Sequence, residues 1–161
     1  TKNKKIKVIK MKKKEISLED TVEKLRRTEL LLLITRKIAG LKNLSEILWT
    51  LIAMTTEELG ADRGSLFLND PLTGELYSRV AQGDLTREIR ILNTTGIAGS
   101  IFQSGEGEII HNAYEDERFN SKIDEQTGYV TKNIVCAPVR TVRNDVIGVI
   151  QILNKKRGRF R

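Results

Sequence analysis

The segment SLFLNDPLTGELYSRVA, residues 65–81, contains two apolar runs on either side of a cluster of turn-forming residues. The runs cover residues 65–68 and 76–81, and the cluster between them includes Pro71 and Gly74. This pattern is typical of two strands joined by a short connection. It predicts a β-hairpin near the middle of the chain.

Short strands dominate the sequence after this hairpin. Strands are predicted at residues 88–92, 108–111, 134–141 and 146–153. A short helix is predicted at residues 97–102, ending at Gly105. Residues 112–133 are polar and too long for a structureless connection, so we expect them to be functional or to hold a short helix. The second half is therefore expected to be rich in strands, without a βαβ repeat.

Two helices are predicted before the hairpin. In residues 18–41 apolar residues recur at the three- and four-residue spacing of an amphipathic helix, with a phase slip near Glu29. The slip makes an imperfect coiled-coil pattern, and we expect a homodimer through this helix. A second helix begins near the capping residues Asn43 and Ser45 and ends at Gly60. Its apolar residues share one face, which is expected to cover a core.

The net charge of +7 is concentrated at the two ends of the chain. Residues 1–14 carry eight lysines and no acid, whereas residues 15–154 hold 15 basic residues against 21 acidic ones. The body of the chain is therefore mildly acidic, and no nucleic acid is expected as a partner. Residues 1–17 are interpreted as a basic flank or linker. The longest apolar run, residues 30–34, is far shorter than the roughly 20 residues that span a bilayer.

Few residues are suited to catalysis, since the chain has one histidine, His111, and one cysteine, Cys136. Cys136 lies in an apolar strand, as buried structural thiols do, and His111 is interpreted as a polar residue at a strand end. The acidic residues between 115 and 125 lack the spacing of a calcium loop. The sequence therefore predicts neither an enzyme active site nor a metal site. A lone cysteine forms no internal disulfide, which favours a reducing, cytoplasmic setting.

The sequence GIAG at residues 96–99 is a candidate anion site. Small residues at a helix start allow a ligand to approach backbone N–H groups whose dipoles favour negative charge. The alternative is that Gly96 and Gly99 serve only packing and capping.

Several motifs together resemble a family of small-molecule sensor domains. They are RGSLFL at 63–68, GIAG at 96–99, FN at 119–120, IDEQTGYVTKNI at 123–134, CAPV at 136–139 and IGVIQILNK at 147–155. From residue 41 onward the chain resembles a GAF domain, and specifically those of cyclic nucleotide phosphodiesterases and cyanobacterial adenylyl cyclases. The family motif is represented by Asn154, Lys155 and Phe160. The Asp-Glu pair and closing helix that follow it in the family are absent, so the chain is expected to be a fragment.

The resemblance implies an α+β, profilin-like GAF fold. Its central antiparallel sheet of about five to six strands has helices behind it and a ligand cavity on the other face, under a lid at residues 112–133. Carried over residue by residue, the implied ligand-binding residues are Ser65, Ala81, Gln82, Ile97, Ala98, Phe119, Asn120, Asp124, Thr127, Thr131 and Gln151. Of these, Ile97 and Ala98 would present backbone N–H groups to a phosphate. Ala81 and Asn120 stand where nucleotide-binding relatives often have aromatic residues.

The expected function is that of a regulatory, non-catalytic sensor domain that binds a small molecule, with cyclic AMP or cyclic GMP as the candidate ligands. The expected organisation is a flank at 1–17, a signalling helix at 18–41 and a GAF domain at 42–161, with an output domain such as a cyclase, phosphodiesterase or kinase elsewhere in the full-length protein. The alternatives are a dimerisation module without ligand and a chromophore or haem sensor using Cys136 or His111. Methionine sulfoxide reduction, as in some free-standing GAF proteins, needs several cysteines, and this chain has one.

Overall fold

The computed structural model describes residues 18–83 and 88–161, which divide into one compact unit ending at Ala39 and another beginning at Gly40. The predicted flank at 1–17 lies outside the described residues. The helices are α1 (Leu18–Ile38), α2 (Leu44–Glu58), α3 (Gly96–Ser104), the 3-10 turn η1 (Ala113–Glu115) and α4 (Lys122–Thr127). The strands are β1 (Ala61–Asp70), β2 (Glu75–Ala81), β3 (Arg90–Leu92), β4 (Glu108–Ile110), β5 (Ile134–Arg140) and β6 (Val146–Lys155).

Helix α1 confirms the first predicted helix but ends at Ile38, because the chain turns at Ala39 and Gly40. None of its residues is buried, and the side chains of Leu18 and Leu25 are 80% and 58% exposed. Several large apolar side chains of the helix are therefore exposed. Over the part of the chain that the structure describes, no helix is both long and apolar enough to cross a membrane.

The six described strands form one antiparallel sheet in the order β3-β2-β1-β6-β5-β4. Both predicted hairpins are confirmed, as β1–β2 and β5–β6. Strands β1 and β6 are longer than predicted because they pair with each other from Ala61 opposite Lys155 to Leu68 opposite Gly148. Gly148 permits this close pairing, since a Cβ atom there would lie 2.1 Å from the carbonyl oxygen of Phe67.

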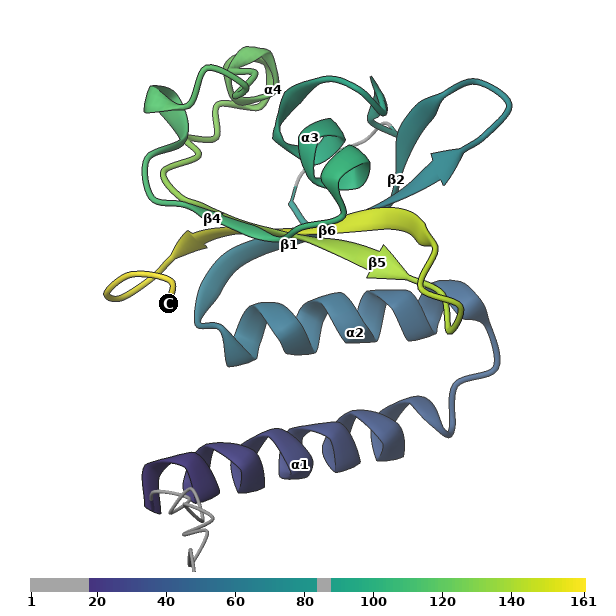
Figure 1. Cartoon of the computed structure of the whole chain (residues 1–161), viewed down its shortest axis with the longest axis vertical. Helices are drawn as coiled ribbons and strands as arrows, with labels where there is room; N and C mark the ends of the chain where they lie inside the picture. Colours follow the sequence, from purple (N-terminus) through teal and green to yellow (C-terminus); the bar gives the residue numbers. More distant parts are fainter. Residues whose placement is uncertain (1–17, 84–87) are drawn as a thin grey trace, which may run out of the picture. The chain divides into compact units, whose positions relative to one another are not determined.

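Helix α2 covers one face of the sheet (Figure 1). It begins as predicted at the N-cap Asn43, whose Oδ1 accepts a hydrogen bond from the Glu46 N–H at 2.8 Å. Its buried residue Ile52 packs with Leu66 of β1 and Val80 of β2. Burial of this apolar face is what fixes the helix to the sheet.

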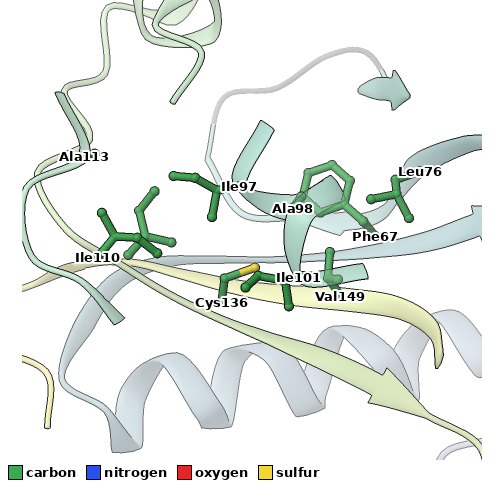
Figure 2. Close-up of a cluster of buried hydrophobic side chains, with 10 residues drawn as sticks. Phe67, Leu76, Ile97, Ala98, Ile101, Ile110, Ala113, Cys136 and Val149 are labelled. Atoms are coloured by element: carbon green, nitrogen blue, oxygen red, sulfur yellow. The ribbon is translucent and has the colours of Figure 1, made fainter. Parts of the chain in front are cut away.

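Helix α3 and the lid, residues 112–133, lie over the opposite face (Figure 1). Under α3, a core forms from Ile101, Phe67, Cys136 and Val149, which lie together in Figure 2. The side chains of Ile101, Cys136 and Val149 are fully buried. The lid contains η1 and α4, as expected from its length, and the space between lid, α3 and sheet holds the candidate site.

Candidate functional site

A cavity of about 470 Å³ lies between the sheet, the start of α3 and the lid. This volume is within the range of roughly 300–1,000 Å³ that is usual for small-molecule sites. Of the eleven predicted site residues, those that line it are Ser65, Gln82, Ile97, Ala98, Phe119, Asn120, Asp124, Thr127, Thr131 and Gln151. The fold thus gathers ten residues that span 87 positions of sequence, while their contact with a ligand stays a prediction.

The floor of the cavity is set by strand register. Ser65 of β1 lies opposite both Gln151 of β6 and Ala81 of β2, so their side chains share the cavity face. The Ser65 side chain is largely buried and has no hydrogen-bond partner among the described residues. Ala81 shares this face but is not among the residues that line the cavity, and its contact with a ligand stays a prediction.

Gln82 lines the cavity but its side chain also completes the sheet. The side-chain Oε1 of Gln82 accepts a hydrogen bond from the Gly64 N–H at 2.7 Å, and the backbone N–H of Gln82 donates to the Gly64 carbonyl at 2.9 Å. The side-chain oxygen therefore substitutes for a backbone carbonyl at the end of β2. What remains for a ligand is the amide NH₂ group.

The start of α3 presents unpaired N–H groups to the cavity. The first backbone hydrogen bond of the helix runs from the Gly99 N–H to the Thr95 carbonyl, and the Thr95 side chain makes no capping bond. Over the described residues, no acceptor binds the N–H groups of Gly96, Ile97 or Ala98. Ile97 and Ala98 are nonetheless buried and line the cavity. Buried donors at a helix N-terminus attract an anion.

Gly96 is needed at this position for its backbone conformation. Its φ of +71° lies in the left-handed region, which lets the chain turn from the loop after β3 directly into α3. This local requirement is compatible with an anion site, so the two interpretations of GIAG do not exclude each other.

The lid is tied down by Asp124, the buried residue of α4. Its Oδ2 accepts hydrogen bonds from the Thr131 N–H at 2.6 Å and the Tyr114 hydroxyl at 3.0 Å, and its Oδ1 accepts from the Thr131 hydroxyl at 2.8 Å. The carboxylate thus joins η1, α4 and the segment that leads into β5. Burial and the hydrogen bond to Asp124 raise the pKa of Tyr114.

Two aromatic rings support this arrangement from one side. The rings of Tyr114 and Phe119 are tilted by 57° with centroids 5.1 Å apart, a favourable geometry for aromatic pairs. Phe119 lines the cavity and Tyr114 does not. Nothing in the sequence pattern identified Tyr114, since a tyrosine in a polar loop gives no signal of its hydrogen-bond partner.

A second group that sequence reasoning missed is the ion network around Arg118, which also lines the cavity. Its guanidinium donates to Glu108 at 2.7 Å, to Asp116 at 2.8 Å and to the Ser100 hydroxyl at 2.9 Å. The network therefore joins β4, the lid and α3. Hydrogen bonds from Arg118 lower the pKa of Glu108 and of Asp116, and the two carboxylates raise that of Arg118.

This network predicts a defined acid sensitivity. A carboxyl whose pKa is lowered by folding contributes stability above its ordinary pKa, here 4.5 for Glu108 and 3.8 for Asp116, and that contribution is lost as the pH falls below those values. We expect Arg118→Met to lose stability at about pH 7 but to show a smaller further loss on acidification to about pH 3 than the wild-type chain. Urea titrations at both pH values measure this. The control is Arg140→Met, because Arg140 donates only to backbone carbonyls; equal acid sensitivity in wild type and Arg118→Met would contradict the prediction.

Arg63 and Tyr129 form a further unpredicted contact at the cavity. The Arg63 guanidinium carbon lies 4.0 Å from the centre of the Tyr129 ring, and the Tyr129 hydroxyl donates to Asp62 at 2.9 Å. Burial, followed by the hydrogen bond to Asp62, raises the pKa of Tyr129. The contact joins the end of the lid to β1 across 66 positions of sequence separation for Arg63 and Tyr129.

The two residues considered for chemistry occupy unremarkable places. Cys136 is fully buried, and this burial raises the pKa of its thiol to about 12, which disfavours the reactive thiolate. His111 is exposed and does not line the cavity. Over residues 18–83 and 88–161, no group of three or more His, Cys, Asp and Glu residues is placed to hold a metal ion.

Comparison with protein families agrees with this geometry. The family model described as "GAF domain" matches residues 43–161. The chain belongs to the GAF domain family. The resemblance and the α+β fold that it implied are therefore confirmed.

Curated relatives of this GAF domain include cyclic nucleotide phosphodiesterases. The chain is 46% identical over 112 residues to "Probable 3',5'-cyclic phosphodiesterase pde-5" of Caenorhabditis elegans, covering 62% of this chain and 15% of the relative. It is 44% identical over 116 residues to the dual 3',5'-cyclic-AMP and -GMP phosphodiesterase 11 of Drosophila melanogaster, covering 62% and 8%. The chain thus spans a small part of the length of these relatives.

Solved GAF structures share the fold. The GAF domain from a phosphoenolpyruvate-protein phosphotransferase of Coxiella burnetii superposes with a TM-score of 0.75 at 20% identity, over 85% of this chain and 82% of that one. The A. Aeolicus nlh2 GAF domain gives a TM-score of 0.69 at 22% identity, over 84% and 83%. At these identities the likeness extends to the fold alone.

The motif residues of this GAF domain hold its elements together. The Asn154 side chain makes hydrogen bonds to the C-terminal end of the lid. Its Oδ1 accepts from the Lys132 N–H at 2.6 Å, and its Nδ2 donates to the Val130 carbonyl at 2.7 Å. The Lys155 ammonium donates to the carbonyl of Leu59, the C-cap of α2. Phe160 is buried with Ala61 and Ile152. None of the three lines the cavity.

Proposed function

We propose that this GAF domain is a regulatory sensor that binds a cyclic nucleotide, cyclic AMP or cyclic GMP, beneath the lid. The observation that carries the proposal is that Ile97 and Ala98, two buried residues that line a cavity of nucleotide size, have unpaired backbone N–H groups. They provide for one phosphate charge without a buried cation of their own. The kinship with proteins named as cyclic nucleotide phosphodiesterases supports the same ligand class.

The charges around the cavity are compatible with an anion. Arg118 lines it but is already paired with Glu108 and Asp116, which leaves Arg63 and Lys122 against the carboxylates of Glu117 and Asp124. The Asp124 carboxylate is already surrounded by three donors, so it adds little repulsion toward an anion. A monoanionic ligand is therefore electrostatically acceptable.

Calorimetry with cyclic AMP and cyclic GMP tests the proposed function. We expect heat and a thermal shift with at least one of them, and a loss of about tenfold or more in affinity for the matching nucleoside, adenosine or guanosine, which lacks the phosphate. The nucleoside is the matched control because it keeps base and ribose. Neither heat nor a thermal shift for either cyclic nucleotide at millimolar concentration would contradict the proposal.

We further propose that the domain acts within a larger cytoplasmic protein, with a basic flank at 1–17, a signalling helix at 18–41 and a GAF domain from 42 onward. Helix α1 would pair with the α1 of a second copy and relay ligand occupancy to an output domain. The support is that its apolar side chains are exposed along the helix, including Leu18, Val22, Leu25 and Leu31.

A substitution on α1 tests the homodimer. We expect Leu25→Gln to weaken self-association at least about tenfold, because it removes one large apolar side chain from the paired face. The matched control is Lys24→Gln, one position away. Sedimentation equilibrium measures both, and a wild-type chain that stays monomeric at high concentration with α1 folded would refute the dimer.

A further inference from the structure

The Thr131 hydroxyl donates its proton to another residue of the lid. Thr131 Oγ1 donates to Oδ1 of Asp124 at 2.8 Å, and a carboxylate can accept but not donate. A hydroxyl has a single proton, so Thr131 offers the cavity that it lines only its lone pairs. Water has little access to this hydrogen bond, because Thr131 and Asp124 are only 3% and 7% exposed.

The other threonines of the cavity behave in the same way. The Thr127 hydroxyl donates to the Ile123 carbonyl at 2.8 Å, and the Thr95 hydroxyl donates to the Leu92 carbonyl at 3.3 Å. Both also line the cavity. Thus each threonine hydroxyl in the lining has its proton directed at a protein oxygen.

The part of the lining at the start of α3 has the reverse polarity. The start of α3 offers the N–H groups of Ile97 and Ala98, which are donors only. The cavity therefore has a donor wall at α3 and an acceptor wall at Thr127 and Thr131. A ligand anchored by an anion at α3 therefore meets hydrogen-bond acceptors where it reaches the lid.

We propose that the lid selects ligands by a donor-bearing edge: an amino, imino or hydroxyl group is accepted at Thr127 and Thr131, whereas a carbonyl or phosphoryl oxygen is rejected there. Thr131 is the specificity-determining residue, and Asp124 is a positioning residue that acts through it. The proposal rests on the proposed function and specifies which edge of the nucleotide faces the lid.

The geometry around Asp124 provides a near-isosteric test. The Thr131 N–H and the Tyr114 hydroxyl both donate to Oδ2, so in Asp124→Asn the amide oxygen stays at that position. The NH₂ group then occupies the Oδ1 position and donates to Thr131 Oγ1. This releases the Thr131 proton, and the hydroxyl becomes able to donate to the cavity. The variant reverses the polarity of one atom with little change of shape.

The experiment measures affinities for ligand pairs that differ by one donor. The pairs are cyclic AMP and its analogue without the 6-amino group, cyclic GMP and cyclic IMP, and each nucleotide and its 2'-deoxy form. In the wild-type chain we expect one deletion to weaken binding about threefold to tenfold. In Asp124→Asn and Thr131→Val the same deletion should weaken binding by less than about twofold. Thr131→Ser and the exposed control Glu125→Gln should keep the wild-type ratio of affinities between the two ligands of the pair.

The outcomes separate the two proposals. If wild type binds a cyclic nucleotide but no donor deletion weakens binding, or if the ratio is the same in wild type, Asp124→Asn and Thr131→Val, the donor-edge inference is overturned and the proposed function stands. If wild type binds neither cyclic AMP nor cyclic GMP, the proposed function fails and the inference fails with it.

Discussion

Replacing Asp124 by alanine should release the lid and destabilise the protein by roughly 2–4 kcal/mol. The substitution removes the common acceptor of three hydrogen bonds, two from Thr131 and one from Tyr114. The Thr131 N–H and hydroxyl are buried and would lose their partner, whereas the exposed Tyr114 can turn to water. Most of the cost therefore arises at Thr131.

Two measurements locate this loss. Urea unfolding gives the change in the free energy of unfolding, and hydrogen exchange should show loss of protection across residues 112–133 while the sheet stays protected. If the lid opens locally before global unfolding, the global value is limited by the stability of the lid itself. Glu125→Ala is the matched control, because Glu125 is exposed and bonds only the neighbouring Ser121 side chain. Unchanged lid protection in Asp124→Ala would show that the carboxylate does not hold the lid.

The fold was largely predictable because local chemistry and tertiary packing agree in it. The hairpin turn between β1 and β2, the Asn43 cap of α2 and the Gly105 end of α3 are each encoded within a few residues. Strand limits were less predictable, since they depend on a partner. β1 begins at Ala61 because Lys155 lies opposite it, which no local pattern reveals.

The sequence allowed us to predict which residues line the candidate site, but not which hydrogen bonds they make. The family resemblance named ten residues that line the cavity, but it did not reveal that the Asp124 side chain accepts hydrogen bonds from Thr131 and Tyr114. Hydrogen-bond direction depends on which atoms meet in space, and residue types alone do not specify it. The ion network of Arg118 could not be predicted for the same reason, because its partners Glu108 and Asp116 lie on different elements.

Asn154 of β6 should be the second most sensitive position for the stability of the lid, although it lies outside the lid and does not line the cavity. It adopts a φ of +58°, and its side chain makes hydrogen bonds to the Lys132 N–H and the Val130 carbonyl. Alanine would lose these bonds and would also be strained in the left-handed conformation. We expect Asn154→Ala to lower the free energy of unfolding by about 2–3 kcal/mol and to weaken ligand binding.

A set of substitutions at Asn154 separates the two contributions. Glycine adopts the left-handed conformation without strain, so Asn154→Gly should be more stable than Asn154→Ala by about 1 kcal/mol, which measures the conformational part. Asn154→Asp keeps an acceptor for the Lys132 N–H but directs an oxygen at the Val130 carbonyl, so it should remain well below wild type. If alanine and glycine proved equally stable, the left-handed backbone would not matter. If aspartate matched wild type, the bond to the Val130 carbonyl would not contribute to stability.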